Sequence, residues 1–248
     1  MVCTTSPEPF VDSKWRVTTS CHALPNAWVV QAPIMTTGAL LRWWRDHFFP
    51  YSGEDVYRRM DVLAATISPG ADGLVVLPYF SGRGAPDWDR EARGVVWGLT
   101  LAHEQGHVIR AILEGVAMEI RANVEVFEQL GFPIHSVRIV GGGAKSVLWR
   151  SIIGDVLGKP QSVVTEREVG CLGAAILAAT GVGLYNSVSD AVREMTPDIT
   201  AGRFSEETHR IYDEVWERYR EVAARFSNGL KSPSRRFAET VSVQEEAL

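Results

Sequence analysis

The sequence predicts an α/β fold in which a mixed, partly parallel sheet is flanked by helices. Between residues 136 and 180 two strand-like runs alternate with two helical runs, and strands joined through a helix usually lie parallel in one sheet. Residues 104–130 carry one continuous apolar stripe, which indicates a long helix packed on a core. Apolar residues fill 46% of the 248 positions and charged residues 22%, so disordered and low-complexity classes are excluded.

The elements predicted before residue 94 are short. We expect extended chain over residues 2–34 and a first helix opened by a threonine cap at Thr36 and Thr37. In chain order the elements are β-rich runs at 17–19 and 28–31 around a turn at 25–26, helices over 40–48 and 55–67, a strand over 74–77 and a Gly/Pro-rich loop over 80–93.

The longest predicted helix follows, because apolar residues recur every three or four positions until 131–133 (GFP) stops it. The remaining elements are strands over 136–140 and 162–165 and helices over 146–157, 172–180 and 205–226. Residues 227–248 contain few large apolar residues, which predicts a flexible tail after a domain at 1–226.

Charge and cysteine content exclude several classes of protein. Thirty acidic against 25 basic residues give a net charge of −5, which argues against nucleic acid or an anionic membrane as the partner. No run approaches the roughly 18 apolar residues of a membrane helix, and the N-terminus does not resemble a signal peptide. Three scattered cysteines form neither a disulfide framework nor a metal cluster. We therefore expect a soluble, cytoplasmic protein.

A glycine run is the strongest local signal for a binding site. A hydrophobic strand ends at Val140, three glycines follow, and a helix opens near Ser146. Glycines let a ligand approach the backbone, and free amides at a helix start favour an anion or a polar ring edge. The spacing matches neither a Walker A loop nor a dinucleotide fingerprint. On spacing alone, nucleotide contact and a tight turn without a ligand remain equal alternatives.

Two further patterns carry weaker signals. His103, Glu104 and His107 spell H-E-x-x-H, a zinc-hydrolase pattern, but they lie at the start of a helix and lack a third ligand, so a polar helix start is the favoured interpretation. The loop at 81–89 combines two glycines with Arg83 and Asp87. Such loops often line ligand sites, but we expect a surface turn with both charges solvated.

Several segments together resemble the C-terminal domain of the FGGY carbohydrate kinases. The resemblance extends over about residues 2–226. Its most specific part is GVVWGL at 94–99, followed after seven residues by HVIRAILE at 107–114. Further matching segments are 77–82, 88–89, 92–94, 141–146, 148–149 and 173–178. Residues 22–25 and 41–43 are similar to the xylulokinase-like branch.

The resemblance implies an actin-like, ribonuclease-H-like domain that takes part in transferring the γ-phosphoryl group of ATP to a sugar or polyol hydroxyl, with Mg²⁺. It implies that Gly142, Gly143 and Ala144 line the adenosine site, with Lys145 and Ser146 beside it. The loop holding Gly82 and Gly84 would approach the nucleotide phosphates. The resemblance assigns no metal ligand in this chain.

Family members also carry an N-terminal half with the sugar site and the catalytic aspartate, and this sequence corresponds to the second half only. By the same resemblance, we expect the first strand and phosphate loop of that half to be missing before Val2. We therefore expect no catalytic residue here, no activity from this chain alone, and either self-association or a partner chain that supplies the N-terminal half. The alternative is a non-catalytic nucleotide-binding or interaction module from a truncated gene.

Overall fold

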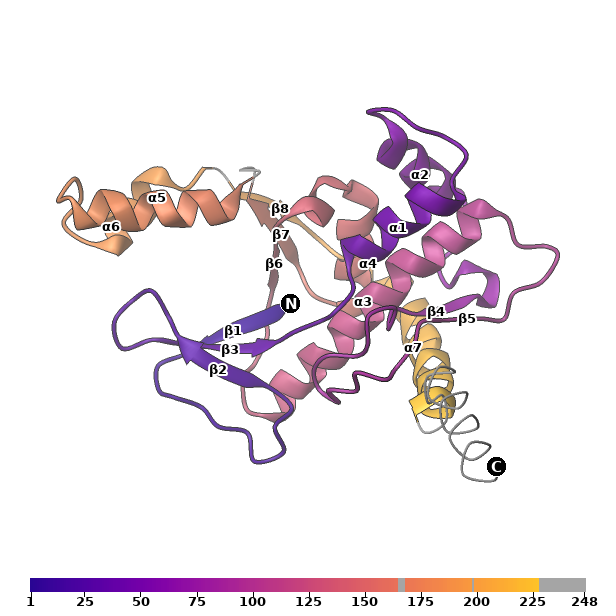
Figure 1. Cartoon of the computed structure of the whole chain (residues 1–248), viewed down its shortest axis with the longest axis horizontal. Helices are drawn as coiled ribbons and strands as arrows, with labels where there is room; N and C mark the ends of the chain where they lie inside the picture. The colour runs from indigo at the N-terminus through magenta and orange to yellow at the C-terminus, as the bar shows by residue number, and fades with distance from the viewer. Residues whose placement is uncertain (165–167, 198, 228–248) are drawn as a thin grey trace, which may run out of the picture.

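The computed structural model describes residues 1–164, 168–197 and 199–227 (Figure 1). The helices are α1 (Gly38–Phe48), α2 (Val56–Ala65), α3 (Gln105–Gln129), α4 (Val147–Leu157), α5 (Val169–Gly181), α6 (Val188–Met195) and α7 (Glu206–Ser227), with 3₁₀ turns η1 (Ala71–Gly73) and η2 (Gly142–Lys145). The strands are β1 (Val2–Ser6), β2 (Thr18–Cys21), β3 (Trp28–Ala32), β4 (Val75–Leu77), β5 (Val95–Trp97), β6 (Val137–Ile139), β7 (Gln161–Val164) and β8 (Ile199–Gly202). The tail predicted at 227–248 lies, after its first residue, outside the described residues.

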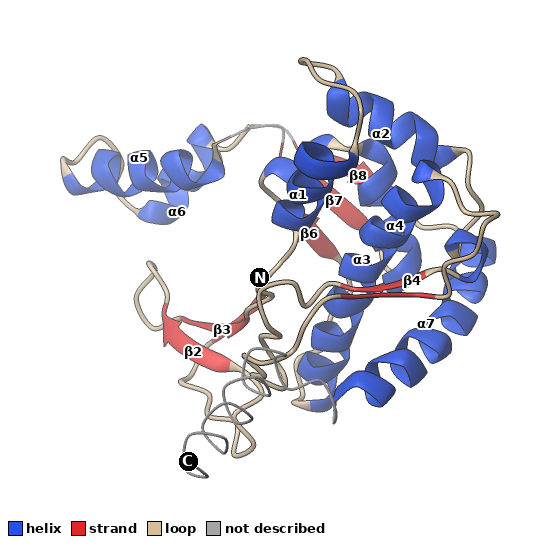
Figure 2. Ribbon diagram, turned by 45° about the vertical axis from the view of Figure 1, so that its right-hand side comes forward, coloured by secondary structure: helices blue, strands red, loops and turns tan. Residues whose placement is uncertain are grey.

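Helix α3 forms the centre of the core. Its apolar stripe is buried against α2, α4, α7 and β4, which surround it in Figure 2. Ile109, Leu113 and Phe127 are fully buried along its length. The long helix predicted over 104–130 is confirmed as α3, and its buried residues extend almost from end to end.

The partly parallel sheet is confirmed by β6, β7 and β8. Strand β6 pairs in parallel with β7 after the α4 crossover, and β8 pairs antiparallel with β7. Two smaller antiparallel sheets, β1–β3–β2 and β4–β5, complete the pairing. The chain is thus an α/β fold with a mixed sheet flanked by helices, as predicted.

Strands β1 and β6 are both edge strands. Within the described part of the chain, β1 pairs only with β3 and β6 only with β7. Figures 1 and 2 both place the N-terminus, where β1 begins, beside the β6–β7–β8 sheet. Val2 at the start of β1 also packs against the main core. Two strand edges therefore remain open on neighbouring parts of the molecule.

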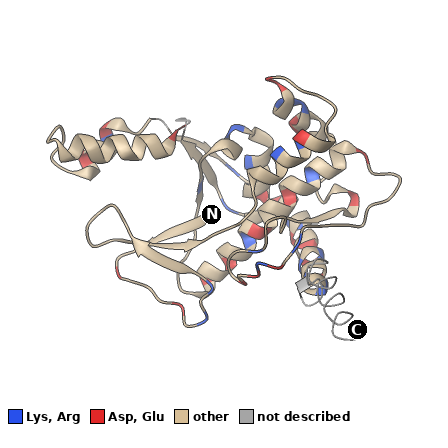
Figure 3. Ribbon diagram, viewed as in Figure 1, with Lys and Arg blue, Asp and Glu red and all other residues tan. Residues whose placement is uncertain are grey.

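Helices α5 and α6 form a hairpin that projects from the body (Figures 1 and 2). Glycine, alanine and leucine dominate α5, yet Ile176 is its one buried residue among those described, and Leu177 is 46% exposed. Neither α5 nor the three strands β1, β2 and β3 carry a charged residue, as Figure 3 shows. Helix α5 therefore presents an apolar, uncharged surface, whereas the charged residues of the hairpin lie on α6.

The prediction that a threonine side chain caps the first helix is wrong. Thr37 occupies the N-cap position, but within the described structure its side chain makes no capping hydrogen bond. Thr36 instead donates its hydroxyl to the carbonyl oxygen of Pro78 at 2.6 Å. A long-range bond to the segment after β4 thus replaces the local cap.

The described part of the chain contains no helix that is long and apolar enough to cross a membrane.

Candidate functional site

The glycine turn, residues 141–146, joins β6 to α4 and leaves its backbone open. Gly141 adopts a φ of +86°, a conformation that favours glycine, and turns the chain into η2. A Cβ built on Gly141 or Gly142 would meet no described atom within 4 Å. Ala144 is buried behind the turn, whereas Lys145 is exposed. A ligand can therefore reach the main chain at these two glycines.

Trp149 forms the floor of the turn. A Cβ on Gly143 would stand 3.0 Å from its indole ring. The indole Nε1 donates to the carbonyl oxygen of Leu113 on α3 at 3.1 Å, and the Trp149 backbone N–H donates to the Ser146 hydroxyl at 3.0 Å. Ser146 is thus the N-cap of α4, which confirms the predicted turn from glycines into a helix.

Asp61 of α2 lies on the other side of Ser146. Burial raises the pKa of the Asp61 carboxyl, and a hydrogen bond with the Ser146 side chain opposes that rise. The glycine turn is therefore supported from both α2 and α3.

In the Arg83 loop, residues 82–84, the backbone conformation and the packing of the chain favour glycine at both ends. Gly82 has a φ of +83°, and its N–H donates to the Tyr79 carbonyl oxygen at 3.0 Å. A Cβ on Gly84 would overlap the carbonyl oxygen of Pro33, which also accepts from the Ala85 N–H at 2.9 Å. The loop is held tightly against the segment between β3 and α1.

Arg83 is largely buried, so the expectation that both charges of this loop are solvated is wrong for Arg83. Its side chain is only 15% exposed, with Nε 3.3 Å from Glu119 Oε1 and the guanidinium 4.9 Å above the Tyr79 ring. Asp87, 51% exposed, pairs with its outer nitrogen at 2.5 Å. Burial disfavours the charge of Arg83, but Glu119, Tyr79 and Asp87 together outweigh burial and raise the pKa of the guanidinium.

The two glycine segments are anchored on one helix but have different neighbours. The glycine turn is tied to Leu113 of α3, and the Arg83 loop to Glu119 of the same helix. Those two positions are separated by about 9 Å of helical rise. Helix α3 therefore fixes the spacing between the segments predicted to hold the adenosine and the phosphates.

The H-E-x-x-H residues cap α3. The Glu104 carboxylate accepts from the His107 backbone N–H, and His107 Nδ1 accepts from the Glu104 N–H at 3.0 Å. His107 Nε2 contacts Asp72 at 3.1 Å, and His103 Nδ1 accepts from the Thr100 N–H at 2.9 Å. Among the described residues, no three His, Cys, Asp or Glu side chains are grouped as metal ligands would be. The pattern is explained by capping.

Two buried carboxylates on α3 were not predicted as functional. Glu114 and Glu119 are 3% and 1% exposed, and burial raises the pKa of each against the opposing charge of Arg110 or Arg83. The sequence did contain a signal for them, because both glutamates lie inside an otherwise apolar run, where a charged side chain is buried only if it is paired. Each carboxylate needs a fixed counter-charge, and the structure supplies one to each.

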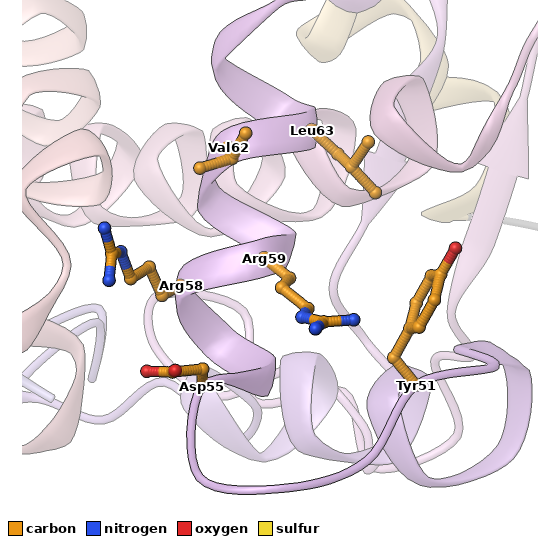
Figure 4. Close-up of a pocket in the computed structure, with 6 residues that line it drawn as sticks. All are labelled: Tyr51, Asp55, Arg58, Arg59, Val62 and Leu63. Atoms are coloured by element: carbon orange, nitrogen blue, oxygen red, sulfur yellow. The ribbon is translucent and has the colours of Figure 1, made fainter.

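None of the predicted site residues lines the cavity in Figure 4. It has a volume of about 480 Å³ and is formed by α2 and the turn before it. Arg59 lies over the Tyr51 ring at 5.2 Å, with Arg58 on the opposite side of the helix. Its remaining lining residues are Asp55, Val62 and Leu63.

Comparison with known proteins gives consistent matches. Residues 1–182 match the C-terminal domain of the FGGY family of carbohydrate kinases. Gluconokinase of Bacillus subtilis is 35% identical over 197 residues, which are 76% of this chain and 38% of that protein. Xylulose kinase of Staphylococcus epidermidis is 26% identical over 201 residues, 81% of this chain and 40% of that protein.

Solved structures of carbohydrate kinases also match this chain. The crystal structure of xylulose kinase from Rhodospirillum rubrum superposes with a TM-score of 0.77 at 30% identity, covering 90% of this chain and 44% of that one. Glycerol kinase of Plasmodium falciparum, solved with ADP, shares the fold with a TM-score of 0.68 at 22% identity, covering 86% of this chain and 42% of that one. The chain spans less than half the length of these relatives.

Proposed function

Because the chain belongs to the FGGY family of carbohydrate kinases, whose C-terminal domain its residues 1–182 match, we propose that it is the nucleotide-binding half of an ATP-dependent sugar kinase. The domain has the actin-like, ribonuclease-H-like fold of its relatives. The proposed reaction transfers the γ-phosphoryl group of ATP to a sugar or polyol hydroxyl in the cytoplasm.

The observation that carries this proposal is the open backbone of the glycine turn. Gly141 and Gly142 leave their main chain open, next to Gly143 above the Trp149 floor and the exposed cation of Lys145. Backbone amides and a nearby positive charge suit an adenine nucleotide, and a Cβ at these positions would occupy the space the ligand needs. Ala144 and Ser146 complete the proposed adenosine site, and Gly82 and Gly84 would face the phosphates.

Phosphoryl transfer needs positioning, charge neutralisation and a base that orients the hydroxyl. We assign this chain the positioning of ATP or ADP. Mg²⁺ would bind chiefly to the nucleotide phosphates, as it does where few protein carboxylates are offered. The sugar site and the base would come from an N-terminal half. Residues around His22 and Trp43 favour a xylulose-like acceptor, whereas the relative that is 35% identical is named a gluconokinase, so both acceptors should be assayed.

Two features support a protein partner. Among the residues that the structure describes, the edges of β1 and β6 have no strand partner, and such edges readily accept another strand. The α5 arm exposes Leu177, Val182 and Leu184, an apolar surface of the kind that partners cover. We propose that a chain supplying the N-terminal half covers these surfaces, and that without it the protein self-associates.

Calorimetric titration with ATP and ADP, with and without Mg²⁺, tests nucleotide binding. We expect binding by the wild-type chain, loss of binding in Gly143→Trp, and unchanged binding in His103→Ala. The indole introduced at 143 would collide with Trp149 or fill the space above it, while His103 lies before the start of α3 and outside the glycine turn. Nucleotide binding that survives Gly143→Trp with unchanged affinity would contradict the assignment of the turn.

A second assay separates the kinase half from a non-catalytic binding module. The N-terminal half of a gluconokinase or xylulokinase relative is added in trans, and sugar-dependent release of ADP is followed. Release only when both halves and a sugar are present supports the kinase half. Nucleotide binding without any release, despite complex formation, favours the non-catalytic alternative.

A further inference from the structure

Helix α7 supplies two buried tyrosines that reach two buried glutamates of α3 in the same way. The Tyr212 hydroxyl donates to Glu114 Oε1 at 2.9 Å, and the Tyr219 hydroxyl donates to Glu119 Oε2 at 3.0 Å. Both tyrosines are at most 2% exposed. An arginine balances each carboxylate: Arg110 at 2.7 Å from Glu114, and Arg83 at 3.3 Å from Glu119. Each cluster thus joins a tyrosine of α7 to a glutamate of α3, with one arginine as the counter-charge.

The two clusters contact different parts of the chain. In the first cluster, Glu114 Oε1 accepts a hydrogen bond at 3.0 Å from the N–H of Gly70, which lies in the turn before β4. In the second cluster, Glu119 accepts a hydrogen bond from Arg83, which lies between Gly82 and Gly84 in the loop proposed to face the nucleotide phosphates. Tyr79 joins only this second cluster, with its hydroxyl 3.3 Å from Glu119 Oε2 and its ring beneath Arg83.

Arg83 is directed into the protein and not toward a ligand. Its Nε donates to the buried carboxylate, and its guanidinium lies over the Tyr79 ring. The loop backbone on the two sides of Arg83 is held by the turn at Gly82 and by the contact between Gly84 and Pro33. Between these two points, the pairing with Glu119 is what holds Arg83 itself.

We propose that Glu119 and Tyr219 are positioning residues that hold the Arg83 loop in place for the nucleotide phosphates. This inference rests on the function proposed above. Tyr219 acts through Glu119 and Arg83 and does not itself touch the nucleotide. Helix α7 lies outside the residues 1–182 that match the family domain, so the proposal gives this helix a part in the phosphate site.

The two clusters provide a matched pair of variants, Tyr219→Phe and Tyr212→Phe, each of which loses one buried hydroxyl from α7. Binding of ADP and of adenosine to the full 248-residue chain is measured by calorimetry, and unfolding by circular dichroism. We expect Tyr219→Phe to weaken ADP binding by about fivefold, the worth of one ordinary hydrogen bond. Adenosine binding should not change, because the glycine turn is anchored separately at Leu113.

Tyr212→Phe should lower thermal stability to a similar extent and leave the ratio of ADP to adenosine affinity unchanged. Equal ratios in the two variants would overturn the inference while leaving the proposed function intact. A wild-type chain that binds neither ligand would overturn both, and the wild-type titration alone reveals this. If Tyr219→Phe does not fold, Glu119→Gln is compared with Glu114→Gln for the same ratio and judged by the same criterion.

Discussion

The backbone N–H of Glu104 donates a 3.0 Å hydrogen bond to Nδ1 of His107, and the Glu104 carboxylate accepts from the His107 N–H in return. Each side chain thus satisfies a backbone donor that the first turn of a helix leaves free. The three-residue spacing of Glu104 and His107 is that of a capping box. A sequence pattern typical of zinc hydrolases therefore arises here from the start of α3.

His107→Ala should lower the free energy of unfolding by about 1 kcal/mol, because it removes half of this cap. Thermal unfolding of both proteins, with and without EDTA, measures the effect. EDTA should shift neither melting temperature, and a drop that occurs only in the wild type would restore the zinc hypothesis.

Gly84→Ala should destabilise the protein by about 1–3 kcal/mol, because the added methyl group overlaps the Pro33 carbonyl oxygen and must displace the loop. Gly142→Ala is the control, since its methyl group would enter open space among the described atoms. Urea unfolding compares the two. Equal stability would show that the contact between Gly84 and Pro33 is not tight in solution.

Arg110→Met should cost about 3–5 kcal/mol, because it leaves the Glu114 carboxylate buried without a counter-charge. Adding Glu114→Gln should recover much of that loss, since a neutral amide oxygen can still accept from Gly70 and Tyr212. Arg220→Met, at an exposed pair with Glu217, should cost less than about 1 kcal/mol. Urea unfolding gives all three values. A double variant less stable than Arg110→Met would contradict the argument.

Asp12 should make stability depend on pH in the acid range. Hydrogen bonds from the side chain and backbone of Arg16 lower the pKa of its carboxyl to about 2. In the unfolded chain the Asp12 carboxyl has a pKa of about 4. The stabilisation is therefore complete above that pH and is lost as pH falls through about 2.

Asp12→Asn should therefore cost about 1–2 kcal/mol at neutral pH, discounted for the partial exposure of Arg16, and the difference from wild type should shrink toward pH 2. Melting temperatures between pH 7 and 2 check this. Asp46→Asn, at an exposed pair with Arg45, serves as the control and should show little pH-dependent difference. A gap between Asp12→Asn and wild type that stays constant with pH would refute the assignment.

Long, strongly periodic segments could be predicted from the sequence to within a few residues. Helix α3 was expected over 104–130 and α7 over 205–226, because each carries an apolar stripe that only a helix can bury. The passage from β6 through the glycine turn into α4 was also readable, since three glycines between a hydrophobic strand and a helical pattern leave few alternatives.

Short elements with distant partners could not be predicted. Strand β5 consists of the strand-favouring residues Val-Val-Trp but is only three residues long and forms by pairing with β4. Strand β8 contains an alanine and a glycine, so its composition shows no strand pattern, and it forms by pairing with β7. Helix α6 was missed although Ser187 precedes Asp190 by three positions and caps the helix, a signal present in the sequence.

The buried pairing of Arg83 with Glu119 is a different case. The two residues lie 36 positions apart and belong to a loop and a helix, so no local pattern connects them. Arg83 was expected in solvent because arginine in a Gly/Pro-rich loop usually is. Only the folded chain shows that α3 places a carboxylate beneath that loop.

The indole of Trp149 beneath Gly143 makes the turn optically observable. Trp149 and Trp216 are 5% and 6% exposed, whereas Trp15 is 73% and Trp88 is 40% exposed, so an aqueous quencher such as iodide suppresses fluorescence from the exposed rings and spares these two buried ones. A molecule settling on Gly143, or a displacement of the turn, changes the surroundings of this indole by contact. The chain therefore contains an intrinsic, label-free reporter at the centre of its glycine turn.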